Sequence, residues 1–202
     1  MEYLGHIVSH EVVKVYHNKI KAIKEWKVPT TITQLHRFLR LTGYYRKIFK
    51  NYGRIAAPPT TLLKKDAFSW TPEATKAFTH LKEAMCIASV LATPDFTKTF
   101  IVECDSLGNG IGVVLVQEGG PIAFESRPIK GKYLQKAIYE REMLAILHAR
   151  KKWKPYLMGR HFKVNTDHDS IKHFLEERLH FEEQQKWVTK MLGYDLDRKS
   201  VV

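Results

Sequence analysis

The spacing of hydrophobic and polar residues changes character near residue 96. Before that point, apolar residues recur at helical spacing in three stretches, 17–26, 31–43 and 73–85. In the third stretch one side carries only apolar residues: Ala74, Ala77, Phe78, Leu81 and Met85. Thr31 to Gln34 has the form of a capping box, and Thr71 precedes Pro72, so both stretches have helix-start signals. The pattern predicts a mainly helical segment over residues 1–92, with the apolar stretch 1–9 as a lone strand.

After residue 96 the pattern becomes strand-like. Runs at 100–105, 110–117 and 121–127 predict three strands with short connections, and Gly119-Gly120 is typical of a tight turn. A long helix over about 134–157 and a fourth strand over 161–166 follow. A strand, long helix, strand unit pairs its two strands in parallel, so the predicted sheet is mixed. Further elements are expected beyond it: a short helix from Ser170, another over 182–191 and a fifth strand from Gly193.

The charge of the chain points to a polyanionic partner. The 202 residues carry a formal net charge of +12, which favours nucleic acid. Basic residues cluster at 19–27, 46–54 and 148–163, and the last two clusters are interleaved with aromatic residues, as suits phosphate contact with base stacking. Solvated helix faces are the alternative for these clusters. Helix packing is likewise the alternative for four aromatic residues, Tyr44, Tyr45, Phe49 and Tyr52.

Several classes of protein are disfavoured by the sequence. It has no apolar run of about 18 residues, so no membrane span is expected. Cys86 and Cys104 do not make a disulfide framework and suit a reducing compartment, with Cys104 expected as a buried thiol. No phosphate-binding loop, nucleophile elbow or zinc-type His/Cys cluster occurs.

Three acidic residues stand where a site would form. Asp105 ends the strand 100–105, Asp167 follows the strand 161–166, and Glu142 lies on the long helix. The carboxyl ends of parallel strands are a favoured position for sites in open α/β sheets. On the helix, Glu142 falls about 70° from the centre of the apolar stripe, so we expect it at the rim, outside the core. The stripe consists of Tyr139, Met143, Ile146, Leu147, Trp153 and Leu157.

Converging carboxylates predict a divalent metal site. Magnesium prefers hard oxygen ligands, and two ions can activate water and stabilise the leaving oxygen in phosphodiester hydrolysis. Gly108, Gly110 and Gly112 remove side-chain bulk where a nucleic acid backbone could approach. Taken singly, each acid is better explained as an ordinary surface carboxylate; the ordered trio with its glycines favours a site.

The chain resembles the Pol polyprotein of gypsy-type LTR retrotransposons over nearly its whole length. The resemblance lies in YLGHIVS (3–9), in the stretch from KIKAIKEWKVP (19–29) to residue 58, in LATPDFTKTFIVECDSLGNGIGVVLVQ (91–117), and in YEREMLAILHARKKW (139–153) and HFKVNTDH (161–168). It implies a mixed α/β fold: a ribonuclease H-like five-stranded sheet with flanking helices, preceded by a mainly helical reverse transcriptase thumb. The implied domains are the palm end (1–10), the thumb or connection (11–92) and a ribonuclease H-like domain (93–202), C-terminally truncated.

The resemblance implies cleavage of the RNA strand of an RNA/DNA hybrid with two Mg²⁺ ions, Mn²⁺ being the alternative. Asp105, Glu142 and Asp167 match the catalytic, metal-holding acids of the family. The expected nucleic-acid contacts are Gly108, Gly110, Arg127, Tyr139, Lys151, Lys152 and His168. The implied partners are the hybrid and the remainder of a Pol polyprotein, with no membrane, in the cytoplasm or nucleus; the oligomeric state stays open.

Two features of the family's pattern do not occur in the sequence. One is the YxDD-type polymerase motif, so this polypeptide is not expected to polymerise DNA. The other is a fourth acid in a helix after the fifth strand; Asp195 and Asp197 lie within the predicted strand. Three hypotheses follow: a ribonuclease H-type enzyme fragment, a non-catalytic module that binds nucleic acid, and an inert relic that does not fold cooperatively.

Overall fold

The computed structural model describes residues 2–3, 6–9, 12–65, 67–87, 90–105, 110–129, 131–160 and 162–166. The chain divides into two compact units. The first takes residues up to 93 together with 123–128, and the second takes 94–122 with the described residues from 129 onward. The domain boundaries expected from the resemblance stay a prediction.

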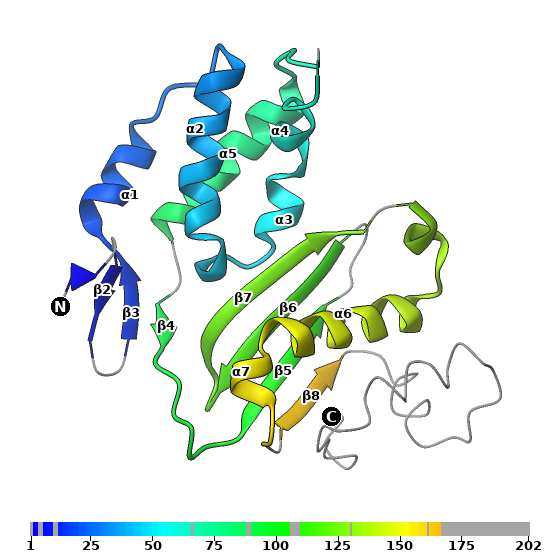
Figure 1. Ribbon diagram of the computed structural model, residues 1–202. Helices are drawn as coiled ribbons and strands as arrows, with labels where there is room; N and C mark the ends of the chain where they lie inside the picture. Colours follow the sequence, from blue (N-terminus) through cyan, green and yellow to red (C-terminus); the bar gives the residue numbers. More distant parts are fainter. Residues whose placement is uncertain are drawn as a thin grey trace. The chain divides into compact units, whose positions relative to one another are not determined.

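A small antiparallel sheet opens the first unit. Its strands are β1 (Glu2–Tyr3), β2 (His6–Val8), β3 (Val12–Val15) and β4 (Leu91–Ala92), in that order (Figure 1). The expectation of a lone strand in residues 1–9 is therefore wrong. Val13 pairs locally with Val8 on one side and with the distant Leu91 on the other, and only the second partner leaves no local pattern.

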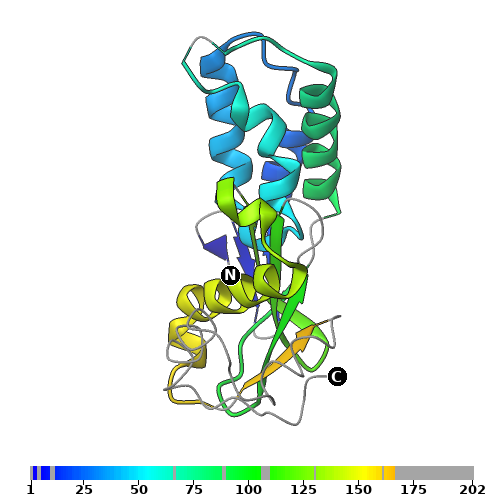
Figure 2. The same cartoon turned by 90° about the vertical axis from the view of Figure 1, so that its right-hand side faces the viewer.

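Helices make up most of the rest of the stretch up to residue 93 (Figure 2). They are α1 (His17–Lys24), α2 (Ile32–Tyr44), α3 (Tyr52–Ile55), α4 (Ala57–Thr61) and α5 (Pro72–Cys86), with a 3₁₀ turn at Arg46–Ile48. Both predicted caps are confirmed: Thr31 Oγ1 accepts from the Gln34 N–H at 3.3 Å, and Thr71 Oγ1 from the Ala74 N–H at 3.2 Å. The returning bond of the capping box is displaced by one residue, because Gln34 Oε1 accepts from the Thr30 N–H.

The apolar side of α5 is buried as its spacing predicts, and all five of its members belong to the core. Phe38 of α2 packs on Phe78 with ring centroids 4.5 Å apart. The helix-packing alternative holds for Tyr45 and Phe49, which are buried, whereas Tyr44 is 51% exposed and stacks on His6.

The second sheet is mixed, as predicted. Its strands are β5 (Phe100–Asp105), β6 (Gly110–Gln117), β7 (Gly120–Pro128) and β8 (Phe162–Thr166), in the order β7-β6-β5-β8 (Figure 1). β5 pairs antiparallel with β6 and parallel with β8. Glu118 and Gly119, both at positive φ, form the turn between β6 and β7. The predicted fifth strand and the two helices before it lie outside the described residues.

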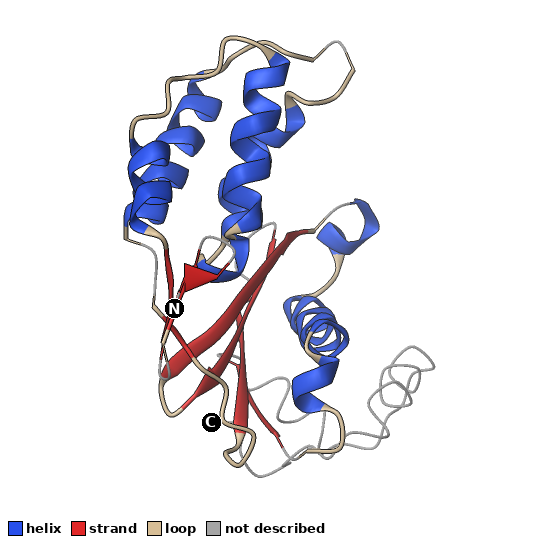
Figure 3. Cartoon of the chain, turned by 60° about the vertical axis from the view of Figure 1, so that its left-hand side comes forward, coloured by secondary structure: helices blue, strands red, loops and turns tan. Residues whose placement is uncertain are grey.

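Helix α6 (Ile138–Lys152) lies on one face of this sheet (Figure 3). The prediction of one continuous helix over 134–157 is wrong. A 3₁₀ turn at Gly131–Gln135 precedes α6, and a short helix, α7 (Lys154–Leu157), follows it. Pro155 lacks the N–H that would continue the hydrogen-bond ladder of α6.

Within the described ranges, no helix has the length and apolarity needed to cross a membrane. Cys86 and Cys104 are both free thiols, and Cys104 is buried as expected.

Candidate nucleic-acid processing site

Glu142 is buried in the second unit, on the side of α6 that faces the sheet. Its exposed fraction is 2%, and no other carboxylate among the described residues belongs to the buried set. The expectation that it lies at the rim, outside the core, is wrong. Met143, Ala145, Ile146 and Ala149 of α6 are buried with it. The buried face of α6 thus includes Glu142 together with two members of the predicted apolar stripe, Met143 and Ile146.

A hydrogen bond joins this carboxylate to the sheet. Thr166 Oγ1 donates to Glu142 Oε2 at 2.8 Å, and Thr166 is 5% exposed. Alternation along β8 turns Phe162, Val164 and Thr166 toward the interior, which places a hydroxyl at the last inward position of the strand. A buried carboxylate requires such donors, since burying an unsatisfied charge is costly.

The ends of β5 and β8 lie side by side, as the parallel pairing predicts. The register pairs Cys104 with Thr166, so Asp105 ends β5 beside the carboxyl end of β8. On its other side Asp105 pairs with Gly112 of β6, a position without side-chain bulk. The side chain of Asp105 and all of Asp167 and His168 lie outside the described residues.

Cys104 adds no negative charge to this region. Burial raises the pKa of its thiol far above the usual range, and the nearby carboxylates of Glu142 and Glu103 raise it further. The thiol is therefore neutral at physiological pH. It is not a reactive nucleophile, because reactivity requires the thiolate.

Among the described side chains, the Glu142 carboxylate offers the oxygen atoms that a divalent cation binds. These side chains do not make a complete metal site. Within the described part of the chain, no group of three or more His, Cys, Asp or Glu residues lies close enough to hold a metal ion. Two of the three predicted ligands fall outside that part, so the predicted metal set stays a prediction. Glu142 fits it, because its buried carboxylate is a hard oxygen donor held in one orientation by Thr166.

The predicted nucleic-acid contacts are placed in part. Gly110 begins β6 and is buried, Lys151 is exposed near the end of α6, and Lys152 is half-buried. Arg127 is exposed on β7, in the stretch that belongs to the first unit. Tyr139 lies on α6, but its side chain is outside the described residues. Gly108 lies wholly outside them.

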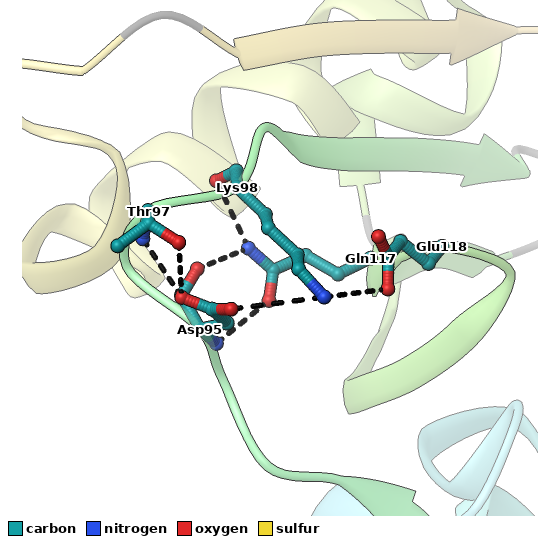
Figure 4. A network of polar contacts seen from close by, with 5 residues as sticks. All are labelled: Asp95, Thr97, Lys98, Gln117 and Glu118. Carbon is teal, nitrogen blue, oxygen red and sulfur yellow. Dashed lines mark hydrogen bonds and ion pairs between the residues drawn. The ribbon is translucent and has the colours of Figure 1, made fainter.

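Two polar residues of the second unit were not predicted. One is Thr166, whose signal is its inward position in the alternating strand HFKVNT. The other is Gln117, which ends β6 and holds the turn before β5 (Figure 4). Gln117 Nε2 donates to the Asp95 and Lys98 carbonyls at 2.8 and 3.1 Å, and its Oε1 accepts from the Asp95 N–H at 2.9 Å. No local pattern signals this role, because the partners are some 20 residues away in sequence.

Comparison with known proteins agrees with this architecture. Residues 70–164 match the family described as the RNase H-like domain found in reverse transcriptase. The chain is 40% identical over 179 residues to the retrovirus-related Pol polyprotein from transposon 297 of Drosophila melanogaster, covering 87% of this chain and 17% of that polyprotein. For the transposon gypsy polyprotein of the same fly, the identity is 35% over 201 residues, covering 93% and 19%. The chain thus spans less than a fifth of either relative.

Solved structures show the same fold. The foamy viral protease-reverse transcriptase in complex with an RNA/DNA hybrid has a TM-score of 0.80 at 18% identity, covering 100% of this chain and 29% of that chain. The structure of its dRH form in complex with double-stranded DNA gives a TM-score of 0.82, also at 18% identity, covering 95% and 36%. With its family match and its transposon relatives, the chain belongs to the family of retrotransposon Pol polyproteins and contains a ribonuclease H-like domain.

Proposed function

We propose that this polypeptide hydrolyses the RNA strand of RNA/DNA hybrids. The observation that carries the proposal is the buried carboxylate of Glu142, held by Thr166 beside the carboxyl ends of two parallel strands. Asp105 ends one of these strands, and Asp167 is the residue that follows the other in sequence. Three acids with these positions are the expected ligands of Mg²⁺, or of Mn²⁺ in its place.

When bound, two such ions supply an activated water and stabilisation of the leaving oxygen. The chain's own residues supply the ligands and their orientation. Asp105, Glu142 and Asp167 would hold the ions, Glu142 being kept in one orientation by the Thr166 hydroxyl. Packing of α6 on the sheet excludes water from the Glu142 side chain, which strengthens its electrostatic interactions.

Charge supports a nucleic acid as the partner. The formal net charge of +12 attracts phosphates, and the foamy viral structures of the same fold are complexes with double-stranded DNA and with an RNA/DNA hybrid. We propose the hybrid as substrate, with exposed Lys151 and half-buried Lys152 among the cations that contact its backbone. We place this activity in the cytoplasm or nucleus, as the two free thiols suit a reducing compartment.

We propose hydrolysis and not DNA synthesis for this polypeptide, since its sequence contains no Asp-Asp pair of the YxDD type. Non-catalytic binding is the competing function, and the same experiment separates the two.

The test is cleavage of a hybrid labelled on its RNA strand, in Mg²⁺, by the parent and by Asp105→Asn and Glu142→Gln. Both variants should lose more than about 100-fold of the rate, because even partners of metal ligands are worth 10- to 100-fold. Glu103→Gln is the matched control: it neutralises an exposed carboxylate on the same strand as Asp105, so its rate should equal the parent's. Hybrid binding by the parent without cleavage would refute hydrolysis and establish a binding module.

A further inference from the structure

The bond between Glu142 and Thr166 links two elements that are 24 positions apart in sequence. Glu142 lies on α6 and Thr166 ends β8, and both side chains are at most 5% exposed. The described residues contain four buried polar or charged side chains: Thr42, Gln117, Glu142 and Thr166. Two of these four, Glu142 and Thr166, bond to each other.

A threonine hydroxyl has properties that suit it to orient a metal-binding carboxylate. Its single proton is donated to one carboxylate oxygen, which restrains the orientation of the group. The hydroxyl is neutral, so it leaves the negative charge of the carboxylate available to a cation. Its β-branched side chain also suits the strand and restricts rotation about χ1.

The place of Thr166 in the strand strengthens this interpretation. Thr166 directly precedes Asp167, so one dipeptide supplies both a predicted ligand and a donor to another ligand on α6. The register sets Thr166 beside Cys104, the residue before Asp105. A shift of β8 by one residue would remove the hydroxyl from the interior, because side chains alternate along a strand.

We propose that Thr166 is a positioning residue that orients Glu142 for divalent metal binding. The inference rests on the proposed function and deepens it. Thr166 does not contact substrate in this role; it acts through the carboxylate. Partners of metal ligands that lie outside the coordination shell are worth about 10- to 100-fold in metal affinity or activity.

The test measures Mn²⁺ binding by isothermal titration calorimetry, together with hybrid cleavage, for Thr166→Val and Thr166→Ser. Valine keeps the shape and loses the donor, so Mn²⁺ affinity and cleavage should each fall about 10- to 100-fold. Serine keeps the donor and should restore both to within about threefold of the parent, a rescue that a purely structural role does not predict. Thr42→Val is the matched control, since it removes another buried hydroxyl, one that donates to the Phe38 carbonyl in the first unit.

Circular dichroism establishes which variants are folded. If Thr166→Val fails to fold, Thr166→Ser and Thr166→Ala are compared, since these differ in the hydroxyl alone. Unchanged Mn²⁺ affinity in a folded variant that lacks the hydroxyl overturns the inference about Thr166. If the parent still cleaves the hybrid in that case, the proposed function stands. A parent that neither binds Mn²⁺ nor cleaves the hybrid overturns both.

Discussion

Replacement of Gln117 by Leu tests how the second unit holds its sheet. Gln117 is 6% exposed, and its amide makes three hydrogen bonds to the backbone of Asp95 and Lys98, between 2.8 and 3.1 Å long. The Gln117 amide thus makes hydrogen bonds to the backbone of this turn that a neighbouring strand would make within a sheet. Leucine has nearly the same volume, so burial is kept while the three bonds are lost.

The expected loss follows from these bonds. Each contributes about 0.5 to 1.5 kcal/mol net, so three together could reach about 4 kcal/mol. The turn is partly exposed, and water can replace the Gln117 amide at some of the freed backbone groups, which reduces the loss. Because leucine also adds apolar burial, we expect the free energy of unfolding to fall by about 2 kcal/mol.

The assay is urea unfolding followed by circular dichroism, with the difference taken at a common m-value. Glu118→Gln is the control: it removes the neighbouring exposed ion pair with Lys98 and should leave the midpoint unchanged. A loss below about 0.5 kcal/mol for Gln117→Leu would refute the reasoning, since the turn would then be held by other contacts.

Two further predictions concern this unit. The Thr97 hydroxyl and N–H, with Lys98, hold the pKa of Asp95 below its usual value. The ionised Asp95 therefore stabilises the folded protein above the unfolded pKa of about 3.9, and this stabilisation is lost as pH falls through the lower folded pKa. Asp95→Asn should therefore flatten the fall in melting temperature below about pH 4, and parallel curves for parent and variant would contradict this. Gly119 has φ of +78° with no atom within 4 Å of an added Cβ, so Gly119→Ala should cost about 1 kcal/mol from the backbone alone, measured by urea unfolding. Gly119→Asn should cost less, because asparagine tolerates this conformation; equal losses would argue against backbone strain as the cause.

Local patterns predicted α1, α2 and α5 and the four strands β5 to β8, because their signals lie within a few residues. The Thr31 and Thr71 caps bond to N–H groups three residues on, and the buried side of α5 follows directly from its spacing. The break of the long helix near Pro155 also has a local cause, yet the apolar stripe around it suggested continuity. The small β1–β4 sheet was missed; its β3–β4 pairing joins residues far apart in sequence, whereas β1, β2 and β3 pair locally.

For the candidate site, the sequence by itself determined the order of the three acids, the place of Asp105 at the end of β5 and that of Glu142 on α6; the place of Asp167 stays a prediction. It also determined the parallel pairing of β5 with β8, because a strand, helix, strand connection imposes it. Only the tertiary structure decided that Glu142 is buried and not at a rim, and that Thr166 bonds to it. The physical reason is that helical spacing gives the direction of a side chain, whereas its burial depends on how closely the helix approaches the sheet. Ala145 and Ala149, on the following turns of α6, are fully buried too, which only the packing shows.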